Sequence, residues 1–329
     1  MKEMKSAYIA GTGSYVPEEV ISNFDLEKMV DTTDEWIRTR TGISERRIAA
    51  KNEPTSDLAV KAAQAALEDA GMEPQELDMI ITATVTPDMI LPSAGCVIQK
   101  KIGAPNAAAF DVAAACSGFL YALSIADQFV KSGQYKNILI VGADTLSKVT
   151  DWTDRSTCIL FGDGAGAVIL KPTDETRGIL STHLYSDGTI SDLLEVPAGG
   201  SLIPASRESL EARLHYITMK GNGLFKIAVK ALSDSIQTAI THQGVTADDI
   251  DLFIFHQANA RIIQAVGERL SIPESKIPLT IEKYGNTSAA SIPITLDELH
   301  KDEKIHPGNL LCFAAFGGGL TWASSMVRW

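Results

Sequence analysis

Three side chains of this chain are suited to nucleophilic chemistry: the thiol of Cys116, the imidazole of His256 and the carboxamide of Asn286. Cys116 begins a helical pattern, and the positive potential at a helix N-terminus favours a thiolate and lowers the pKa of the thiol. His256 follows an apolar run, where the next helix is expected to start, and Asn286 begins another helical pattern. Taken singly, each residue could instead be structural: a buried thiol, a paired core histidine, or a turn asparagine.

The elements that must position these side chains repeat along the chain. Ala66–Ile81 and Ala239–Ile254 each read as a helix that ends at a glycine, a short acidic turn, and an apolar run that contains one aspartate. The helical patterns that begin at Cys116 and Asn286 each lead to an apolar run, and each half then closes with a glycine cluster. The same features in the same order predict a tandem duplication of one α/β unit. A pseudo-two-fold axis between the halves would bring Cys116 and Asn286 together.

The duplication divides the chain into residues 1–173 and 174–329, since the polar segment 171–178, with its proline and glycine, lies between the halves. The Thr-Ser-Asp sequence at 55–57 is expected to cap a helix with a face of small residues, and such faces let helices approach closely. Glu195–Gly221 is expected to be a long loop. Loops of that length in a compact domain tend to be functional.

The remaining cysteines, histidines and glycines favour structural roles. Cys96, Cys158 and Cys312 lie in apolar runs and are expected to be buried. No two histidines have the spacing of a metal site, and neither glycine cluster has the spacing of a phosphate loop, so we expect neither a metal nor a nucleotide cradle. In the second cluster, a free N–H at Gly318 could form half of an oxyanion hole, or the glycines could permit a tight strand crossing.

Composition and charge exclude several classes of protein. The chain has 329 residues and a formal net charge of −12, so it lacks the surplus of basic residues that a nucleic-acid binder needs. The N-terminal segment has no apolar core of a signal peptide, and the most apolar window contains Asp111, so we expect a cytoplasmic protein with no membrane span. The clearest basic cluster, 38–47 beside Trp36, suits phosphate recognition with aromatic stacking, or is a solvated loop with salt bridges.

Seven short motifs occur in a fixed order along nearly the whole chain. They are Gly11-Thr-Gly-Ser, Asp34-Glu-Trp-Ile, Asp111-Val-Ala-Ala-Ala-Cys116, Phe161-Gly-Asp-Gly-Ala-Gly, His256-Gln-Ala-Asn259, Tyr284-Gly-Asn-Thr-Ser-Ala-Ala-Ser291 and Phe316-Gly-Gly-Gly-Leu-Thr-Trp322. In these motifs the sequence resembles β-ketoacyl-acyl carrier protein synthase III, the initiating ketosynthase of type II fatty-acid synthesis. The resemblance implies the thiolase-like α/β fold, with five layers (α/β/α/β/α) built from two duplicated halves, and a homodimer that needs no cofactor or metal.

The resemblance also implies roles for the residues at matching positions. Cys116 would be the nucleophile, His256 and Asn286 would complete a catalytic triad, and the backbone at Cys116 and Gly318 would form the oxyanion hole. For coenzyme A it implies Trp36, Arg40 and Arg155 at the adenine and phosphates, and Gly221, Asn222, Phe225 and Asn259 along the pantetheine channel. For docking of the acidic carrier protein it implies Lys226, Arg261 and Arg269, and for the acyl pocket Leu91 and Phe316.

The implied activity is that of an acyltransferase. It would condense an acyl-CoA primer with malonyl-acyl carrier protein, with loss of CO₂ and CoA, to give 3-ketoacyl-acyl carrier protein. Four residues depart from the family pattern: Leu91 replaces a Phe that closes the partner subunit's acyl pocket, Ser117 an Ala, Ala260 a Leu, and Glu268 stands where a docking Lys is expected. The alternatives are a ketosynthase III-like enzyme of secondary metabolism with a different acyl donor, a Cys-His-Asn hydrolase and a non-catalytic scaffold. A biosynthetic thiolase is disfavoured, because the chain has no second cysteine in a Cys-x-Gly loop.

Overall fold

Two β-sheets organise the computed structural model, which describes residues 6–329 apart from the side chain of Asn222. The first sheet has the strand order β1-β7-β6-β4-β5, with β1 (Ser6–Tyr15), β7 (Asp163–Thr173), β6 (Ile138–Thr145), β4 (Met79–Ala83) and β5 (Ala108–Val112). The second has the order β11-β12-β13-β8, with β11 (Leu252–Phe255), β12 (Leu310–Gly317), β13 (Thr321–Arg328) and β8 (Gly178–Ser186).

The two sheets follow one plan. Along β1-β7-β6-β4 the pairings are antiparallel, antiparallel and parallel, and along β8-β13-β12-β11 they are the same. The strands that correspond come in the same chain order, so the predicted duplication is confirmed in the topology. Strand β5 has no counterpart in the second sheet and lies at an edge of the first. The expected division at 173/174 falls in the connection between β7 and β8.

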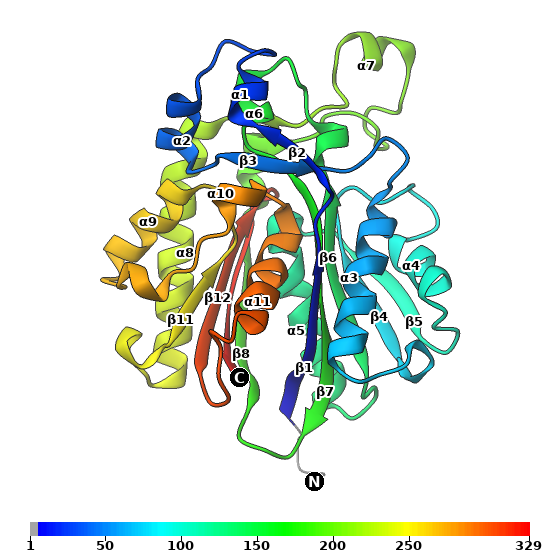
Figure 1. The fold of residues 1–329 in the computed structure, drawn as a ribbon, viewed down its shortest axis with the longest axis vertical. Helices are drawn as coiled ribbons and strands as arrows, with labels where there is room; N and C mark the ends of the chain where they lie inside the picture. The colour runs from blue at the N-terminus through cyan, green and yellow to red at the C-terminus, as the bar shows by residue number, and fades with distance from the viewer. Residues whose placement is uncertain (1–5) are drawn as a thin grey trace.

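Helices cover both sheets and fill the space between them. Figure 1 shows α3 and α4 on one side of the molecule, α8 and α9 on the other, and α5 with α11 in the middle. Their bounds are α3 (Thr55–Asp69), α4 (Ala94–Ile102), α5 (Gly118–Lys131), α8 (Gly221–Gln243), α9 (Ala260–Arg269) and α11 (Ser291–Lys301). Three apolar clusters fill the interfaces: one between the sheets around α5 and α11, and one beneath each outer pair of helices. The five-layered α/β/α/β/α architecture is therefore confirmed.

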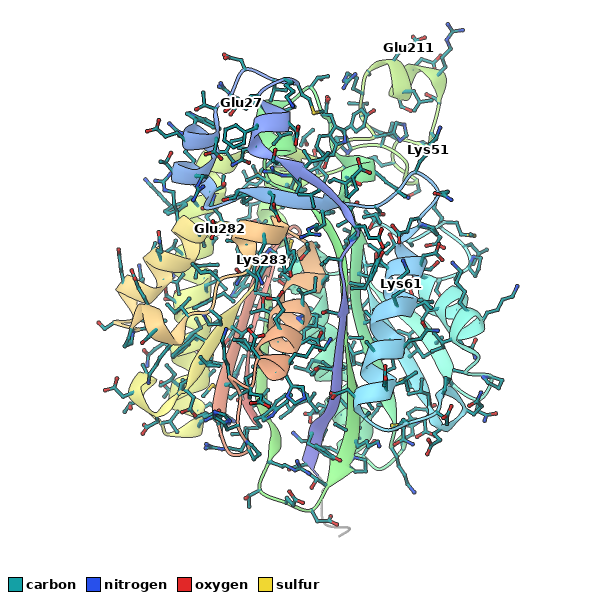
Figure 2. The ribbon with its side chains drawn as sticks, in the orientation of Figure 1. Glu27, Lys51, Lys61, Glu211, Glu282 and Lys283 are labelled. Atoms are coloured by element: carbon teal, nitrogen blue, oxygen red, sulfur yellow. The ribbon has the colours of Figure 1, made fainter. Side chains whose placement is uncertain are left out.

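The short elements gather mostly at one end of these layers (Figure 1). They are β2 (Glu19–Ser22), α1 (Asn23–Leu26), α2 (Asp34–Thr41), β3 (Glu45–Ile48), α6 (Arg155–Cys158), β9 (Leu194–Glu195), α7 (Arg207–Glu211), β10 (Thr218–Met219) and α10 (Ile281–Tyr284). The expected long loop 195–221 thus contains one short helix and one short strand pair. In Figure 2 the side chain of Glu211 marks the outer end of α7, which projects from the body of the molecule.

Small residues let β1 and α3 lie in direct contact, as the face of small residues predicts. A Cβ on Gly13 would lie 2.3 Å from the Ala62 carbonyl oxygen, and one on Gly11 would lie 2.6 Å from that of Ala66. The predicted cap of α3 is wrong. Pro54 occupies the N-cap position, because the hydroxyl groups that follow it bind Thr86, Thr145 and Asp88 on neighbouring segments instead of the first turn.

No helix among residues 6–329 is long and apolar enough to cross a bilayer.

Candidate active site

Cys116 lies at the carboxyl end of the first sheet, in a 3₁₀ turn (Ala115–Ser117) between β5 and α5. The turn is strained, since Ala115 has a φ of 45°. Gly317 at the end of β12 packs directly against it: a Cβ on Gly317 would lie 2.6 Å from the backbone nitrogen of Cys116. The glycine cluster therefore permits a close approach of two backbones at the nucleophile, one of the two functions expected for it.

His256 directly follows β11 and lies four residues before α9, not at the helix start as expected. Its backbone N–H donates to the carbonyl of Ala314 at 2.8 Å, which fixes the residue to β12. The ring nitrogen Nδ1 lies 2.7 Å from the hydroxyl oxygen of Ser291, the first residue of α11. The other nitrogen, Nε2, is buried without a hydrogen-bond partner. Burial lowers the pKa of His256 to about 3, so the imidazole is neutral at physiological pH.

The contacts of the Ser291 hydroxyl favour one of the two neutral tautomers of His256. Ser291 Oγ accepts the backbone N–H of Gln257 at 3.2 Å, which leaves its own hydrogen free to donate to Nδ1. An imidazole that accepts at Nδ1 carries its hydrogen on Nε2. His256 then presents an N–H donor to the site.

Asn286 is held by backbone contacts on both sides. Its N–H donates to the Leu160 carbonyl at 2.8 Å, and its carbonyl accepts the N–H of Gly162 at 3.0 Å. Gly162 has no room for a side chain, since a Cβ there would lie 2.2 Å from the carbonyl oxygen of Tyr284. The side-chain oxygen of Asn286 accepts the N–H of Ser288 at 2.9 Å, so the amide nitrogen is left to donate elsewhere.

The structure brings the three predicted residues to one cavity of about 220 Å³. Cys116, His256 and Asn286 line it together with Arg40, Gly221, Phe225, Asn259 and Phe316. A second, apolar cavity of about 170 Å³ also opens on Cys116. Its lining includes Val85, Leu146, Leu194, Val196, Ile217, Ser288 and Gly318. Cys116 is therefore the residue at which a mixed cavity and an apolar cavity meet.

The expected low pKa of Cys116 is wrong for this structure. Burial raises the pKa of its thiol to about 12, and the charge of Asp144 acts in the same direction. The helix N-terminus does not compensate, because desolvation disfavours a charged sulfur more than one turn of N–H groups stabilises it. The thiol of Cys116 is therefore protonated in this structure, and its use as a nucleophile would require a group that accepts the proton.

Arg40, which lines the first cavity, lies together with Trp36 and Arg155, although Arg155 is far from the other two in the sequence. The guanidinium carbons of Arg40 and Arg155 lie 4.7 and 4.9 Å from the centroid of the Trp36 ring. Trp36 and Arg40 come from α2, and Arg155 begins α6. Two cations around an indole form a site suited to a phosphorylated heterocycle.

The rest of the basic cluster does not join this site. Arg46 is fully buried and donates to the carbonyl oxygens of Ile21 and Ile159 and to Asn23 Oδ1. Burial lowers the pKa of Arg46 to about 10. Arg38 pairs with Glu282, and Arg47 with Glu45. Arg46 is thus structural, which the sequence did not predict.

The remaining predicted contacts are placed as follows. Phe225 of α8 lies under the guanidinium of Arg261 of α9, at 5.7 Å from ring centroid to guanidinium carbon. Lys226 and Arg261 are exposed near this point, and Arg269 is exposed at the opposite end of α9. Asn259 is the N-cap of α9 and donates to the carbonyl of Arg40. Gly221 lines the cavity, and the side chain of Asn222 lies outside the described part of the chain.

Neither of the two residues predicted for the acyl pocket, Leu91 and Phe316, lines the apolar cavity of the single chain. Phe316 lines the first cavity, beside His256. Leu91 is 84% exposed and lines neither cavity, so its expected contact with a partner subunit stays a prediction. The sequence also did not identify Ser288 and Ser291 as site residues. Both residues belong to the motif that begins at Tyr284. Their position just after Asn286, at the start of the second helical pattern, could have indicated that they lie at the site.

The other cysteines differ from one another. Cys158 and Cys312 are buried as predicted, but Cys96 is exposed, because α4 turns that face of the helix away from the core. Among residues 6–329, no group of three or more His, Cys, Asp or Glu side chains is arranged to hold a metal ion.

A duplicated five-layered α/β fold, with a cysteine, a histidine and an asparagine converging between its halves, defines a thiolase-like condensing enzyme. Comparison with known proteins identifies the family. Residues 110–188 match the model of 3-oxoacyl-(acyl-carrier-protein) synthase III, and residues 240–329 match the model of its C-terminal part. The chain belongs to this family, which is the one that the motifs resemble under its synonym β-ketoacyl-acyl carrier protein synthase III. It is an acyltransferase of the condensing type.

Individual relatives agree over the full chain. A β-ketoacyl-(acyl-carrier-protein) synthase III of Caldanaerobacter subterraneus subsp. tengcongensis is 54% identical, with 100% of this chain and 99% of that protein covered. One of Geobacillus kaustophilus is 53% identical, with 98% and 99% covered. The crystal structure of 3-oxoacyl-(acyl-carrier-protein) synthase III from Aquifex aeolicus VF5 is 49% identical, covers 98% of this chain and 100% of that chain, and has a TM-score of 0.91.

Proposed function

We propose that this enzyme condenses an acyl-CoA primer with malonyl-acyl carrier protein and so begins a fatty-acid chain. The observation that carries the proposal is the pair of cavities that meet at Cys116, one with His256 and Asn286 and one apolar. The alternative in secondary metabolism is not favoured, because the relatives at about half identity over the full chain are synthases of the initiating type.

Acyl transfer comes first in this proposal. Trp36, Arg40 and Arg155 bind the nucleotide end of the acyl-CoA, and the pantetheine arm passes Phe225 and Asn259 into the first cavity. The thiolate of Cys116 attacks the thioester carbonyl, the N–H groups of Cys116 and Gly318 stabilise the oxyanion, and CoA leaves. The acyl chain then occupies the apolar cavity, which has a volume of about 170 Å³.

Condensation uses the two donors. Loss of CO₂ from the malonyl group places negative charge on the thioester oxygen, and His256 Nε2–H and the amide of Asn286 donate hydrogen bonds to it. The resulting carbanion attacks the acyl-Cys116 carbonyl and releases 3-ketoacyl-acyl carrier protein. Because His256 is neutral, it stabilises the enolate without first losing or gaining a proton. The steps use side chains and backbone of this chain alone.

We further propose that the enzyme is a cytoplasmic homodimer that binds an acidic carrier protein. Lys226 and Arg261 supply exposed positive charge beside the channel, and Arg269 supplies it at the far end of α9. Strand β5 is an edge strand, and the nearby segment 85–91 exposes Ile90 at 88% and Leu91 at 84%. A partner subunit that covers this edge would bring Leu91 to the apolar cavity, where a leucine leaves more room than the family's phenylalanine.

The test is a panel of acyl-CoA primers, straight and branched, with malonyl-acyl carrier protein as acceptor. We expect 3-ketoacyl-acyl carrier protein as product, and an acyl group on Cys116 when malonyl donor is omitted, detected by mass spectrometry of the peptides. Free acid from acyl-CoA without any condensation product would identify a hydrolase instead. An acyl group on exposed Cys96 in place of Cys116 would contradict the assignment of the nucleophile.

A further inference from the structure

A buried acidic side chain lies behind the nucleophile and has no place in the reaction as described above. Asp144, near the end of β6, has no exposed surface. One of its carboxylate oxygens, Oδ1, accepts the backbone N–H of Val85 at 2.8 Å, the N–H and hydroxyl of Thr86 at 3.2 and 2.9 Å, and the hydroxyl of Thr84 at 3.1 Å. The other oxygen, Oδ2, has no hydrogen-bond partner.

Ser288 lies between this carboxylate and the thiol. Its hydroxyl interacts with both the Cys116 thiol and the Asp144 carboxyl group, but forms a well-directed hydrogen bond with neither. The residue is 1% exposed and lines the apolar cavity beside Cys116. Buried polar atoms without partners are uncommon in folded proteins, and here two of them, Ser288 Oγ and Asp144 Oδ2, occur next to the reacting sulfur.

The backbone conformation that positions Ser288 is strained. Its φ is 52°, in the left-handed region, and its N–H donates to Asn286 Oδ1. The 3₁₀ turn that it begins (Ser288–Ala290) presses on β6, since a Cβ on Gly142 would lie 2.3 Å from the carbonyl oxygen of Ala289. Strained, over-determined backbone of this kind is typical of functional sites.

We infer that Ser288 and Asp144 form a proton relay that converts the Cys116 thiol into the attacking thiolate. The S–H bond of Cys116 breaks and its electron pair stays on sulfur, while the proton binds Ser288 Oγ. The hydroxyl proton of Ser288 moves to Asp144 Oδ2, so the thiolate and a neutral carboxylic acid are formed together. When condensation releases Cys116 as a thiolate, the same proton returns through Ser288. Ser288 touches the reacting sulfur, and Asp144 acts only through Ser288.

The charges around the site favour a shared proton. Burial raises the pKa of both Cys116 and Asp144, so the pocket disfavours two negative charges and accommodates one. Among the other ionisable side chains that line the two cavities, Glu195 lies in the apolar cavity, and Arg40 and His256 lie in the first. His256 is held neutral by burial and is a poor proton acceptor at physiological pH. The relay keeps the total charge constant, since each transfer moves one proton within the pocket.

The inference deepens the proposed function, and it can be tested without acyl-CoA or malonyl donor. The rate of alkylation of Cys116 by iodoacetamide is measured by peptide mass spectrometry from about pH 6 to about pH 9 on the full-length enzyme, and exposed Cys96 is the internal control. In the unmodified enzyme the rate at Cys116 is expected to stay nearly level, because the thiolate forms by internal transfer. A thiol that must lose its proton to solvent reacts faster as the pH rises, and the rate at exposed Cys96 is measured alongside for comparison.

Two substitutions separate the relay from simple charge repulsion. Asp144→Asn and Ser288→Ala are each expected to slow alkylation of Cys116 at neutral pH by about 10²-fold and to make its rate rise with pH, as for a thiol that loses its proton to solvent. If Asp144 only repelled the thiolate, Asp144→Asn would speed the reaction instead. Ser288→Ala retains the carboxylate and the backbone N–H to Asn286, so it tests the relay even where Asp144→Asn does not fold.

The matched control is Ser117→Ala, which removes a neighbouring buried hydroxyl that donates to the carbonyl of Thr321 and not to the thiol. It should leave the Cys116 profile unchanged. A Cys116 rate that rises tenfold per pH unit in the unmodified enzyme, or a variant as fast as the unmodified enzyme, would overturn the relay. A failure to form 3-ketoacyl product with a level alkylation profile would instead reject the proposed function and leave the relay in place.

Discussion

Replacing His256 with alanine should impair condensation far more than acylation. In the structure, Nε2 is buried and unpartnered in the cavity, and Nδ1 is held by Ser291, so the substitution removes one oriented N–H donor. Loss of one preorganised donor to an oxyanion costs about 2.7–4 kcal/mol, or about 10²–10³-fold in rate. The backbone bond from residue 256 to Ala314 is retained, so β11 and β12 should stay paired.

The assay follows the two half-reactions separately. Acyl-Cys116 is measured by mass spectrometry after rapid mixing with acyl-CoA, and 3-ketoacyl product is measured after malonyl-acyl carrier protein is added to the isolated acyl-enzyme. We expect acylation close to that of the unmodified enzyme and condensation reduced by the factor above. If acylation fell as far as condensation, His256 would be acting as the base for the thiol, and the assignment of a neutral donor would be wrong.

Three further changes test other parts of the site. Gly317→Ala would place a Cβ 2.6 Å from the backbone nitrogen of Cys116, so we expect a loss of about 1–3 kcal/mol in denaturant unfolding together with loss of acyl-enzyme; unaltered acylation would contradict the close packing. Trp36→Ala should raise KM for acyl-CoA and leave kcat nearly unchanged, since Trp36 contacts Arg40 and Arg155 and does not line the cavity that holds Cys116; steady-state kinetics would show an equal fall in kcat if it acted in the chemistry. Because burial lowers the pKa of His256 from 6.5 to about 3, the unfolded chain binds up to one more proton than the folded chain between these pH values. The contribution of His256 to the free energy of unfolding is therefore complete above pH 6.5 and falls by up to about 1.4 kcal/mol per pH unit on acidification. His256→Gln should lose this pH dependence in urea titrations at pH 6.5 and pH 5, and an unchanged pH dependence would reject the pKa shift.

The sequence alone determined the architecture and predicted which groups react. Helix stops at glycine, acidic turns and apolar runs recur in one order, and the topology of the two sheets repeats in the same order. Such signals are local, since hydrophobic periodicity and turn residues determine the secondary structure of the few residues around them. Cys116, His256 and Asn286 were predicted from their matched places in the repeat, and Trp36, Arg40 and Arg155 from the family resemblance.

Only the tertiary structure decided the protonation of these groups and the exposure of their neighbours. The sequence placed Cys116 at a helix N-terminus and predicted a thiolate, but desolvation by the segments packed around its sulfur and the charge of Asp144 raise the pKa of the thiol. It grouped four arginines in one cluster, but the fold buries Arg46 and leaves Arg40 at the cavity. Desolvation and burial depend on atoms brought together from distant parts of the chain, which is why residue types and spacing did not determine them.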